Sequence, residues 1–377
     1  MSTSLPECEV ELLREMCQIY SPSGCESEIA SYLVDYMQRL GWQAYVDSAG
    51  NAVGSTWVGT TGEPPNKCLV FLGHIDTVPG FIPVRVSGGI LYGRGSVDAK
   101  APLAAFISAL ARMRAVAEEI SRMRVVVIGA VGEETDSKGA YHAVRNHSPD
   151  MCIIGEPSGW SNITIGYKGC LNYEVTTRCA VGHSAGSSHS AAEKAVAMWN
   201  ELAAYCDEKS GDNGPFGSLS PTLLSFWTES DGFCDSATMR IVVRLPLQCN
   251  RAALEADMRQ IMKGCEISFG SYQPAFRASK NNVLVRAFLG AIREQHAEPK
   301  FKLKTGTSDM NIVGSVWNCP VVAYGPGDSS LDHTPNEHIA LHEYARSIYV
   351  LSRVIQRCAQ NHGTNEAAVQ TCRDKNA

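Results

Sequence analysis

The feature that most constrains this chain is an apolar run that ends in a histidine and an aspartate two positions apart. Residues 70–77 read Val-Phe-Leu-Gly-His-Ile-Asp-Thr, which is typical of a buried strand followed by a polar turn. Side chains at positions i and i+2 of a strand point to the same face, so His74 and Asp76 can contact each other. The carboxylate can then accept one imidazole N–H and leave the other ring nitrogen free for a metal ion. We interpret His74 as the first ligand of a metal site.

Three later segments follow the same plan, because each is an apolar run that ends in acidic residues. The acidic residues are Asp98, Glu133, Glu134 and Glu156. The apolar runs, such as the strand predicted over residues 123–130, alternate with helical patterns, such as residues 138–146, which predicts an α/β fold with a mainly parallel sheet and helices on both faces. In such sheets the binding crevice lies at the carboxyl ends of the strands. The acidic residues and His74 are therefore expected to converge at that edge.

The pattern changes near Gly169. Residues 171–179 alternate between apolar and polar side chains, as a half-exposed strand does, and further strand and helix patterns follow. Helix and sheet patterns like those of the first part resume at residue 283. A chain of 377 residues is also long for a single core. We predict a catalytic domain of residues 1–169 and 280–377, interrupted by an inserted α+β domain of residues 170–279.

Composition excludes several classes of partner and location. The net charge is −6 and the basic residues are scattered, which argues against nucleic acid or an anionic membrane surface. No apolar run has membrane-spanning length and the first residues lack a signal pattern, so a soluble cytosolic protein is expected. None of the 14 cysteines forms a Cys-x-x-Cys pair. The cysteines are therefore expected to be reduced, small apolar residues.

A second histidine completes the candidate ligand set. His333 lies in a polar stretch, residues 331–338, near the end of the chain. Histidine nitrogens and carboxylate oxygens are good zinc ligands, and this set suits a pair of zinc-like ions. Cobalt or manganese could replace zinc, because sites of nitrogen and oxygen discriminate weakly among such metals. The predicted ligands are His74, Asp98, Glu134, Glu156 and His333.

The neighbouring glutamates Glu133 and Glu134 are expected to have different roles. Adjacent residues point in different directions, so the two side chains cannot readily bind the same ion. One can bind metal while the other accepts a proton from the attacking water and passes it to the leaving amine. Bound metal lowers the pKa of such a water to about 7, so hydroxide forms at neutral pH. The arrangement predicts a metal-dependent hydrolase.

Several stretches of this sequence carry a family resemblance over nearly the whole chain. They are Gly-Arg-Gly-Ser-Val-Asp-Ala-Lys at 93–100, Gly-Tyr-Lys-Gly at 166–169, Lys-Thr-Gly-Thr-Ser-Asp-Met-Asn at 304–311, Tyr-Gly-Pro-Gly-Asp-Ser at 324–329 and Asp-His-Thr at 332–334. With the segments above, they resemble the di-zinc aminoacylase and carboxypeptidase family, which includes acetylornithine deacetylase and succinyl-diaminopimelate desuccinylase. The resemblance is strongest to its lysine-biosynthesis branch, the amino-group carrier protein–lysine/ornithine hydrolases.

The resemblance implies a role for each member of the candidate site. His74 and Glu156 would hold one ion, Glu134 and His333 the other, and Asp98 would bridge the two. Glu133 would be the general base, and Asp76 would orient His74. The inserted domain would be the family's lid, which commonly also forms the interface of a homodimer.

The resemblance also implies residues that contact the substrate. His183, in the Gly-His-Ser-Ala stretch at 182–185, would donate to the oxyanion of the tetrahedral intermediate, although His189 lies close enough to take this role. A preorganised donor of this kind contributes about 3 kcal/mol. Arg244 would bind the substrate carboxylate, because a guanidinium matches a carboxylate in shape and charge. Hydroxyls of Thr305, Thr307 and Ser308 could bind the same carboxylate.

The leading functional hypothesis is hydrolysis of an amide that joins lysine or ornithine to the terminal glutamate of a small acidic carrier protein. The alternative is deacylation of a small N-acyl amino acid by the same residues. A non-catalytic binding protein would tolerate loss of the base or of a ligand, whereas Glu133 and all five ligands are present. A serine hydrolase has little support, because the sequence contains no Gly-x-Ser-x-Gly motif.

Overall fold

The computed structural model of the chain describes residues 6–59, 67–115, 123–183, 185–186 and 188–360. The chain divides into two compact units. The first unit comprises Met1–Ile165, Ala278–Lys302 and Ser308–Ala377, and the second comprises Gly166–Arg277 and Leu303–Thr307. The predicted role of residues 170–279 as a lid and dimerisation domain stays a prediction.

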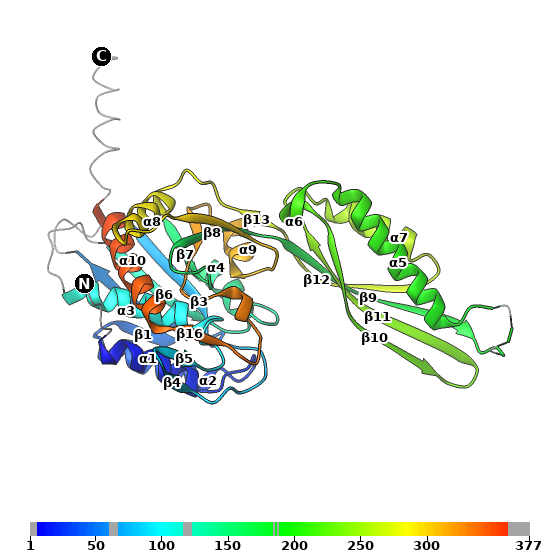
Figure 1. Ribbon diagram of the computed structural model, residues 1–377, viewed down its shortest axis with the longest axis horizontal. Helices are drawn as coiled ribbons and strands as arrows, with labels where there is room; N and C mark the ends of the chain where they lie inside the picture. The colour runs from blue at the N-terminus through cyan, green and yellow to red at the C-terminus, as the bar shows by residue number, and fades with distance from the viewer. Residues whose placement is uncertain (1–5, 60–66, 116–122, 184, 187, 361–377) are drawn as a thin grey trace, which may run out of the picture. The chain divides into compact units, whose positions relative to one another are not determined.

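The larger sheet has parallel strands at its centre (Figure 1). Its strands are β1 (Gln43–Val46), β2 (Ala52–Val58), β3 (Cys68–His74), β6 (Met123–Ala130), β7 (Met151–Gly155), β8 (Asn162–Tyr167), β13 (Phe276–Arg277), β14 (Lys300–Lys304) and β15 (Val321–Ala323). They follow the order β1-β2-β6-β3-β7-β15-β8-β13, and β14 pairs with β8. The central strands β6, β3, β7 and β15 are parallel, whereas β2 and β8 join them antiparallel.

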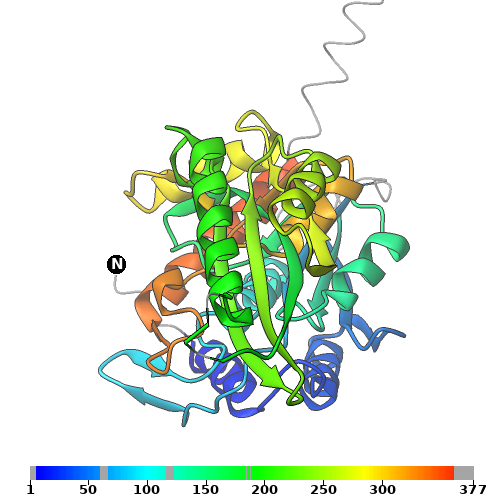
Figure 2. The ribbon, with the colours of Figure 1, turned by 90° about the vertical axis from the view of Figure 1, so that its right-hand side faces the viewer.

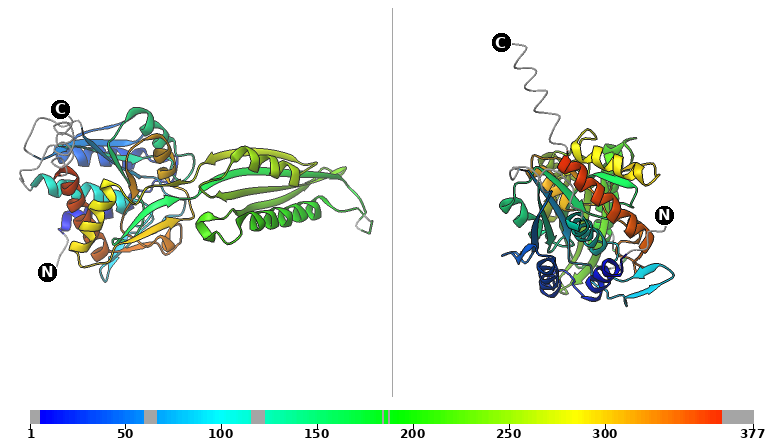
Figure 3. Two further views of the ribbon diagram at one scale, coloured as in Figure 1. Left: turned by 90° about the horizontal axis from the view of Figure 1, so that it is seen from above. Right: turned by 90° about the vertical axis from the view of Figure 1, so that its left-hand side faces the viewer.

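Helices cover both faces of this sheet, which explains why its central strands are continuous apolar runs. One face packs against α1 (Glu7–Gln18), α2 (Ser27–Arg39), α3 (Lys100–Ala115), α8 (Val283–Glu294) and α10 (Leu341–Gln360). Leu69 and Phe71 of β3 belong to this core, and Phe71 stacks on Phe106 of α3. Figure 3 shows α10 beside α8, with which it is in contact. The other face carries α4 (Lys138–Asn146) and α9 (Asp309–Val316), which contact β6 and β15.

A small antiparallel sheet brings two distant segments of the first unit together. Its strands are β4 (Arg85–Ser87), β5 (Ile90–Tyr92) and β16 (His338–Ala340), in the order β16-β5-β4. Gly88 and Gly89 connect β4 to β5 with φ values of 57° and 77°, which glycine adopts without a steric penalty. A short 3-10 helix, η1 (Ser329–Leu331), precedes β16. The pairing of β5 with β16 places the chain after Tyr92 beside the chain before His338.

The second unit is an antiparallel sheet with helices on one face (Figure 2). Its strands are β9 (Gly169–Ala180), β10 (Ser220–Ser230), β11 (Cys234–Leu245) and β12 (Glu266–Gln273), in the order β10-β11-β9-β12. Its helices are α5 (Ala191–Ser210), α6 (Gly214–Gly217) and α7 (Arg251–Ile261). Alternate residues of β9 such as Leu171, Tyr173 and Val175 are buried in the core that α5 and α7 complete. The capping box of Ser190 and Glu193 starts α5.

The predicted fold class is confirmed: the chain is an α/β protein with a mainly parallel central sheet. The strand over 123–130 and the helix over 138–146 have the bounds that the sequence predicts. No cysteine among the described residues forms a disulfide. Within the same residues, no helix is long and apolar enough to cross a membrane.

Candidate metal centre

Three neighbouring strands bring predicted ligands to one edge of the large sheet. β3 lies between β6 and β7, and its last residue, His74, pairs with Ala130 at the end of β6. Gly73 pairs with Gly155, so Glu156 follows β7 at the level of His74. Glu133 and Glu134 lie in the turn that follows β6. The parallel register therefore gathers these side chains at the carboxyl ends of the strands, as the sequence predicts for an α/β sheet.

The imidazole of His74 is buried, at 1% exposed, and both of its ring nitrogens have partners. Nδ1 lies 3.0 Å from the carbonyl oxygen of Asp76 and 3.5 Å from its Oδ1. The sequence suggested the Asp76 carboxylate as the partner, but the carbonyl oxygen is the nearer acceptor. Because a carbonyl only accepts, Nδ1 donates and Nε2 faces the site. Nε2 lies 3.1 Å from Oδ1 of Asp98.

The carboxylate of Asp98 lies between two histidines that come from opposite ends of the chain. Its Oδ1 is 3.1 Å from Nε2 of His74, and its Oδ2 is 3.1 Å from Nε2 of His333. Burial would raise the pKa of the Asp98 carboxyl, but the hydrogen bonds from His333 and His74 hold that pKa well below its usual range. One carboxylate thus contacts both imidazoles.

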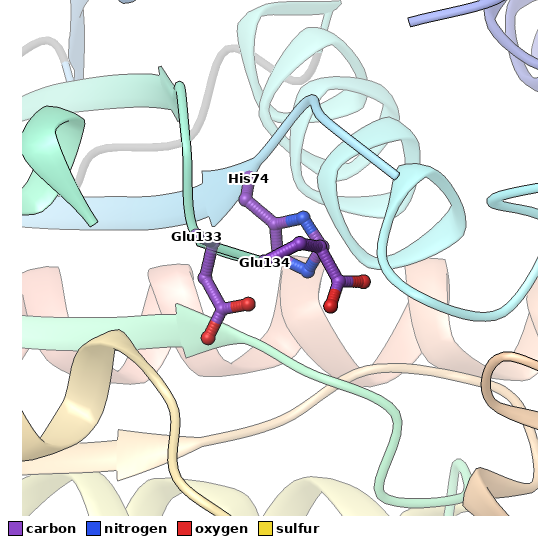
Figure 4. A group of neighbouring side chains, drawn as sticks. All are labelled: His74, Glu133 and Glu134. Carbon is purple, nitrogen blue, oxygen red and sulfur yellow. The ribbon is translucent and has the colours of Figure 1, made fainter. Parts of the chain in front are cut away.

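Asp76 holds the two glutamates by their backbone. Its Oδ1 and Oδ2 accept hydrogen bonds of 3.1 Å from the backbone N–H groups of Glu133 and Glu134, and Oδ2 also accepts one from Ser23 Oγ. The buried Asp76 carboxylate thus fixes the turn after β6. Figure 4 shows the Glu133 and Glu134 side chains leaving that turn on either side of the His74 imidazole. Sequence spacing places Asp76 next to His74 but carries no sign of its contact with this turn.

Two overlapping groups of side chains have the composition and spacing of metal sites. One contains His74, Glu133 and Glu134, and the other contains Asp98, Glu134 and His333, with ligand atoms within 4.8 Å of one another in each group. Nε2 of His333 also lies 3.0 Å from Oε1 of Glu134. Glu156 belongs to neither group. It is nevertheless buried close to the site, because it is 8% exposed and its charge helps to raise the pKa of Glu133.

The electrostatics of the site favour bound cations. Burial raises the pKa of Glu133 well above its usual value, an effect that the neighbouring acids Glu156, Asp309 and Glu134 increase and His74 opposes. Hydrogen bonds to Asp98 and Glu134 raise the pKa of His333 to about 10. Negative charge is therefore in excess at this sheet edge.

The residues fit divalent metal ions. Nε2 of His333 faces carboxylate oxygens of both Asp98 and Glu134, and Nε2 of His74 faces Asp98. The raised pKa values of both histidines indicate that a proton holds each ring against these oxygens in the metal-free site, and a divalent cation can take the place of that proton. A single proton on His333 can be directed at only one of its two oxygens, whereas a metal ion can accept all the donors at once.

Three buried charged residues beside the site were not predicted. Glu337 is 1% exposed and Arg94 is 7% exposed, and they form an ion pair of 2.9 Å. Both lie within the stretches 331–338 and 93–100, which the sequence analysis selected for other residues. Asp309, at the start of α9, is a third: it is 2% exposed, and burial raises its pKa to about 7.

The predicted substrate residues lie in different settings. His183 is exposed in the loop after β9, and His189, near the start of α5, is also exposed. Arg244 of β11 is half-buried and donates to Oγ1 of Thr307 at 3.1 Å. Thr305 is exposed. Ser308 is buried and caps α9, where its hydroxyl accepts from the backbone N–H of Met310 and its backbone N–H donates to Asn311.

Comparison with known proteins identifies the family of this chain. Residues 70–357 match the peptidase family M20/M25/M40. The chain belongs to this family. It is 43% identical to the LysW-lysine hydrolase of Deinococcus radiodurans over 94% of this chain and 99% of the relative. It is 39% identical to a putative LysW-lysine/LysW-ornithine hydrolase of Thermococcus kodakarensis over 96% of this chain and 97% of the relative.

A solved structure in the same family has the same fold. The M20 family metallo-carboxypeptidase of Sulfolobus solfataricus superposes with a TM-score of 0.75, at 17% identity, over 93% of this chain and 99% of that one. Membership of this peptidase family confirms the predicted enzyme class. The chain is a metal-dependent amidohydrolase with a candidate metal site at the carboxyl edge of its parallel sheet.

Proposed function

We propose that this M20 family member releases lysine or ornithine from the terminal glutamate of a small amino-group carrier protein, in lysine or arginine biosynthesis. The observation that carries the proposal is the identity of 43% and 39% to two hydrolases named for LysW-linked lysine or ornithine, across more than nine-tenths of the chain. The site supports it, because a carrier-linked amino acid is joined by an amide bond.

We assign the ligands of two zinc ions, which cobalt could replace, to the residues gathered at the sheet edge. His74 and Glu156 would hold one ion, Glu134 and His333 the other, and Asp98 both. The position of Asp98 between the two imidazoles supports its bridging role. Bound zinc would polarise the scissile carbonyl and make water a better nucleophile at neutral pH.

Glu133 is the proposed general base. Its half-buried carboxylate would take a proton from the attacking water, and as the amide C–N bond breaks it would return that proton to the leaving amine. The raised pKa of Glu133 suits both steps, because a base must hold the proton before it can donate it. Asp76, which accepts hydrogen bonds from the backbone N–H groups of Glu133 and Glu134, would hold the base in position beside the ligands.

Residues of the second unit would bind the substrate, and residues 170–279 would form the lid and the interface of a homodimer. His183 would donate to the oxyanion that forms at the attacked carbonyl. Arg244 would bind a substrate carboxylate together with Thr305 and Thr307, and its contact with Thr307 supports this pairing. Ser308 would join them, because its hydroxyl accepts the backbone N–H of Met310 as the cap of α9 and can still donate its own hydrogen.

The test is a side-by-side hydrolysis assay on metal-reconstituted protein. It offers carrier-linked lysine, carrier-linked ornithine and acetylornithine, with kcat/KM measured for each. We expect the carrier conjugates to be preferred by at least about tenfold, since the specificity ratio reflects binding of the transition state. A preference for acetylornithine would contradict the proposed substrate, keep the chemistry of the site and place the protein among the N-acyl amino acid deacylases.

Replacing Arg244 by lysine is expected to raise KM for the preferred substrate by about tenfold with a smaller change in kcat. Lysine keeps the charge but loses the fork that matches a carboxylate. The nearby Arg240, which lies on the same strand and forms a surface ion pair with Glu174, offers a matched control. Arg240→Lys should leave both constants unchanged. Equal KM values for Arg244→Lys and the unmodified protein would exclude Arg244 from substrate binding.

A further inference from the structure

A buried ion pair connects the backbone around two of the proposed ligands. Glu337 and Arg94 are 1% and 7% exposed, and Arg94 Nη1 lies 2.9 Å from Glu337 Oε2. Removing two charges from water costs several kcal/mol per ion, so such a pair adds little net stability. The role of the pair is therefore better judged from the backbone groups that it binds than from its contribution to stability.

The other carboxylate oxygen of Glu337 binds the backbone at Asp98. Oε1 accepts the N–H of Val97 at 2.9 Å and the N–H of Asp98 itself at 3.0 Å, across 239 positions of sequence. These bonds fix the backbone that carries the Asp98 carboxylate. That carboxylate must lie 3.1 Å from both His74 and His333, so a small rotation of the backbone would break at least one contact.

Arg94 binds the backbone next to the other ligand. Its Nη1 donates to the carbonyl oxygen of Thr334 at 3.1 Å, and its Nε donates to the carbonyl oxygen of Gly80 at 3.0 Å. Thr334 directly follows His333, whose φ of 63° lies in the left-handed region that a histidine rarely occupies. A residue in that conformation needs support from its surroundings, and Arg94 supplies one of the contacts.

The two segments are also adjacent for an independent reason. β5 and β16 pair through Tyr92 and His338, so residues 93–98 and 333–337 diverge from the end of one ladder. The Glu337 carboxylate and the Arg94 guanidinium bridge these segments where the ladder stops. Without them, the backbone at Val97, Asp98 and Thr334 would lose these hydrogen bonds.

We propose that Glu337 and Arg94 are positioning residues that set the distance between Asp98 and His333 and thereby the affinity of the site for its metal ions. The proposal rests on the assignment of Asp98 and His333 as ligands under the proposed function. It differs from a general role in stability, because it places the effect of the pair on metal affinity. Residues that orient ligands in this way typically change metal affinity by about 10- to 100-fold when they are substituted.

The test measures Zn²⁺ affinity by competition with a chromophoric chelator, together with the absorption spectrum of the Co²⁺-loaded protein. Glu337→Gln keeps the size and an acceptor oxygen but loses the charge that Arg94 requires. We expect Zn²⁺ to bind about 10- to 100-fold more weakly and the Co²⁺ bands to shift. If Glu337→Gln does not fold, Arg94→Lys provides the test, because the single nitrogen of lysine cannot take the places of both Nε, which binds Gly80, and Nη1, which binds Thr334 and Glu337.

The matched control is Glu9→Gln. Glu9 is 7% exposed and pairs with Arg112 at 2.6 Å, twelve residues along α3 from Lys100, which is about 18 Å. Its loss should lower stability without changing Zn²⁺ affinity. Wild-type affinity and an unchanged Co²⁺ spectrum in Glu337→Gln, or an equal loss of affinity in Glu9→Gln, would overturn the proposal. Because no substrate is used, these outcomes are separate from the test of carrier hydrolysis; failure of the unmodified protein to bind metal would overturn the ligand assignment itself.

Discussion

Replacing Glu133 by glutamine is expected to lower kcat by about 10³-fold, whichever amide is the substrate. Glutamine has the same shape and leaves the backbone contacts to Asp76 in place, but it cannot take a proton from water and return it to the amine. The bound metal should stay near two ions per chain, because Glu133 is assigned no ligand role. The measurement is single-turnover hydrolysis combined with the metal content of the purified variant.

Asp136→Asn is the control for that substitution. It removes a carboxylate from the same turn, at an exposed residue whose side chain accepts the backbone N–H of Lys138. Asparagine keeps an acceptor for that bond, so activity should change by less than about twofold. Glu133→Gln protein that retained a tenth of the activity would contradict the assignment of the base. Protein that lost a metal ion would make Glu133 a ligand instead.

Removing the metal ions is expected to abolish hydrolysis and to lower the melting temperature, and zinc or cobalt should restore both. A ligand that binds only the folded state stabilises it by mass action. Without metal, the acidic residues at the sheet edge lie close together and are only partly balanced by His74 and His333. Calorimetry of chelator-treated and reconstituted protein measures the difference. Activity that survived complete removal of metal would contradict the enzyme class.

The stabilisation by metal should grow between pH 6 and pH 8.5. The pKa of His333 is raised from 6.5 to about 10 by Asp98 and Glu134, and that of His74 is also raised. A base whose pKa is raised on folding stabilises the folded state fully below pH 6.5, and this contribution is lost as pH rises through about 10. The metal-free protein should therefore lose this stabilisation progressively as the pH rises from 6.5 to about 10.

Metal binding has the opposite pH dependence, because the ions bind the same nitrogens only after the protons leave. The difference in melting temperature between loaded and metal-free protein should consequently widen as pH rises. Groups elsewhere cancel in this difference, including Lys100, whose pKa burial lowers to about 8. A difference that narrows between pH 6 and pH 8.5 would contradict the view that protons and metal compete for these histidines.

Local sequence patterns predicted the central strands and the convergence of the site. β6 and α4 have their predicted bounds, and β3 contains the predicted apolar run and continues beyond Leu72 to His74. Other elements were missed. β8 contains buried polar side chains such as Thr164, and α9 is only 8 residues long, so neither has a pattern strong enough to recognise. Their places depend on β15 and α4, which lie far away in the sequence.

The spacing of residues in the sequence did not predict the hydrogen bonds that complete the site. Asp76 was expected to contact His74, since the two lie on one strand face, and its Oδ1 lies 3.5 Å from Nδ1 of that ring. The same carboxylate also accepts from the turn of Glu133 and Glu134, nearly sixty positions later. Glu337 reaches Asp98 across 239 positions. Such hydrogen bonds produce no periodic pattern in the sequence, because each depends on how two segments approach each other in the folded chain.

Local sequence patterns account for most of the strands and helices, for the donor types and for the sheet edge at which the donors meet. These properties follow from alternation of apolar and polar residues and from the chemistry of histidine and carboxylate, which are local. The tertiary structure decided which oxygen faces which ring nitrogen: it put Asp98 between His74 and His333, and Glu337 behind Asp98. Those distances arise from strand register and the pairing of β5 with β16, which only the packed chain defines.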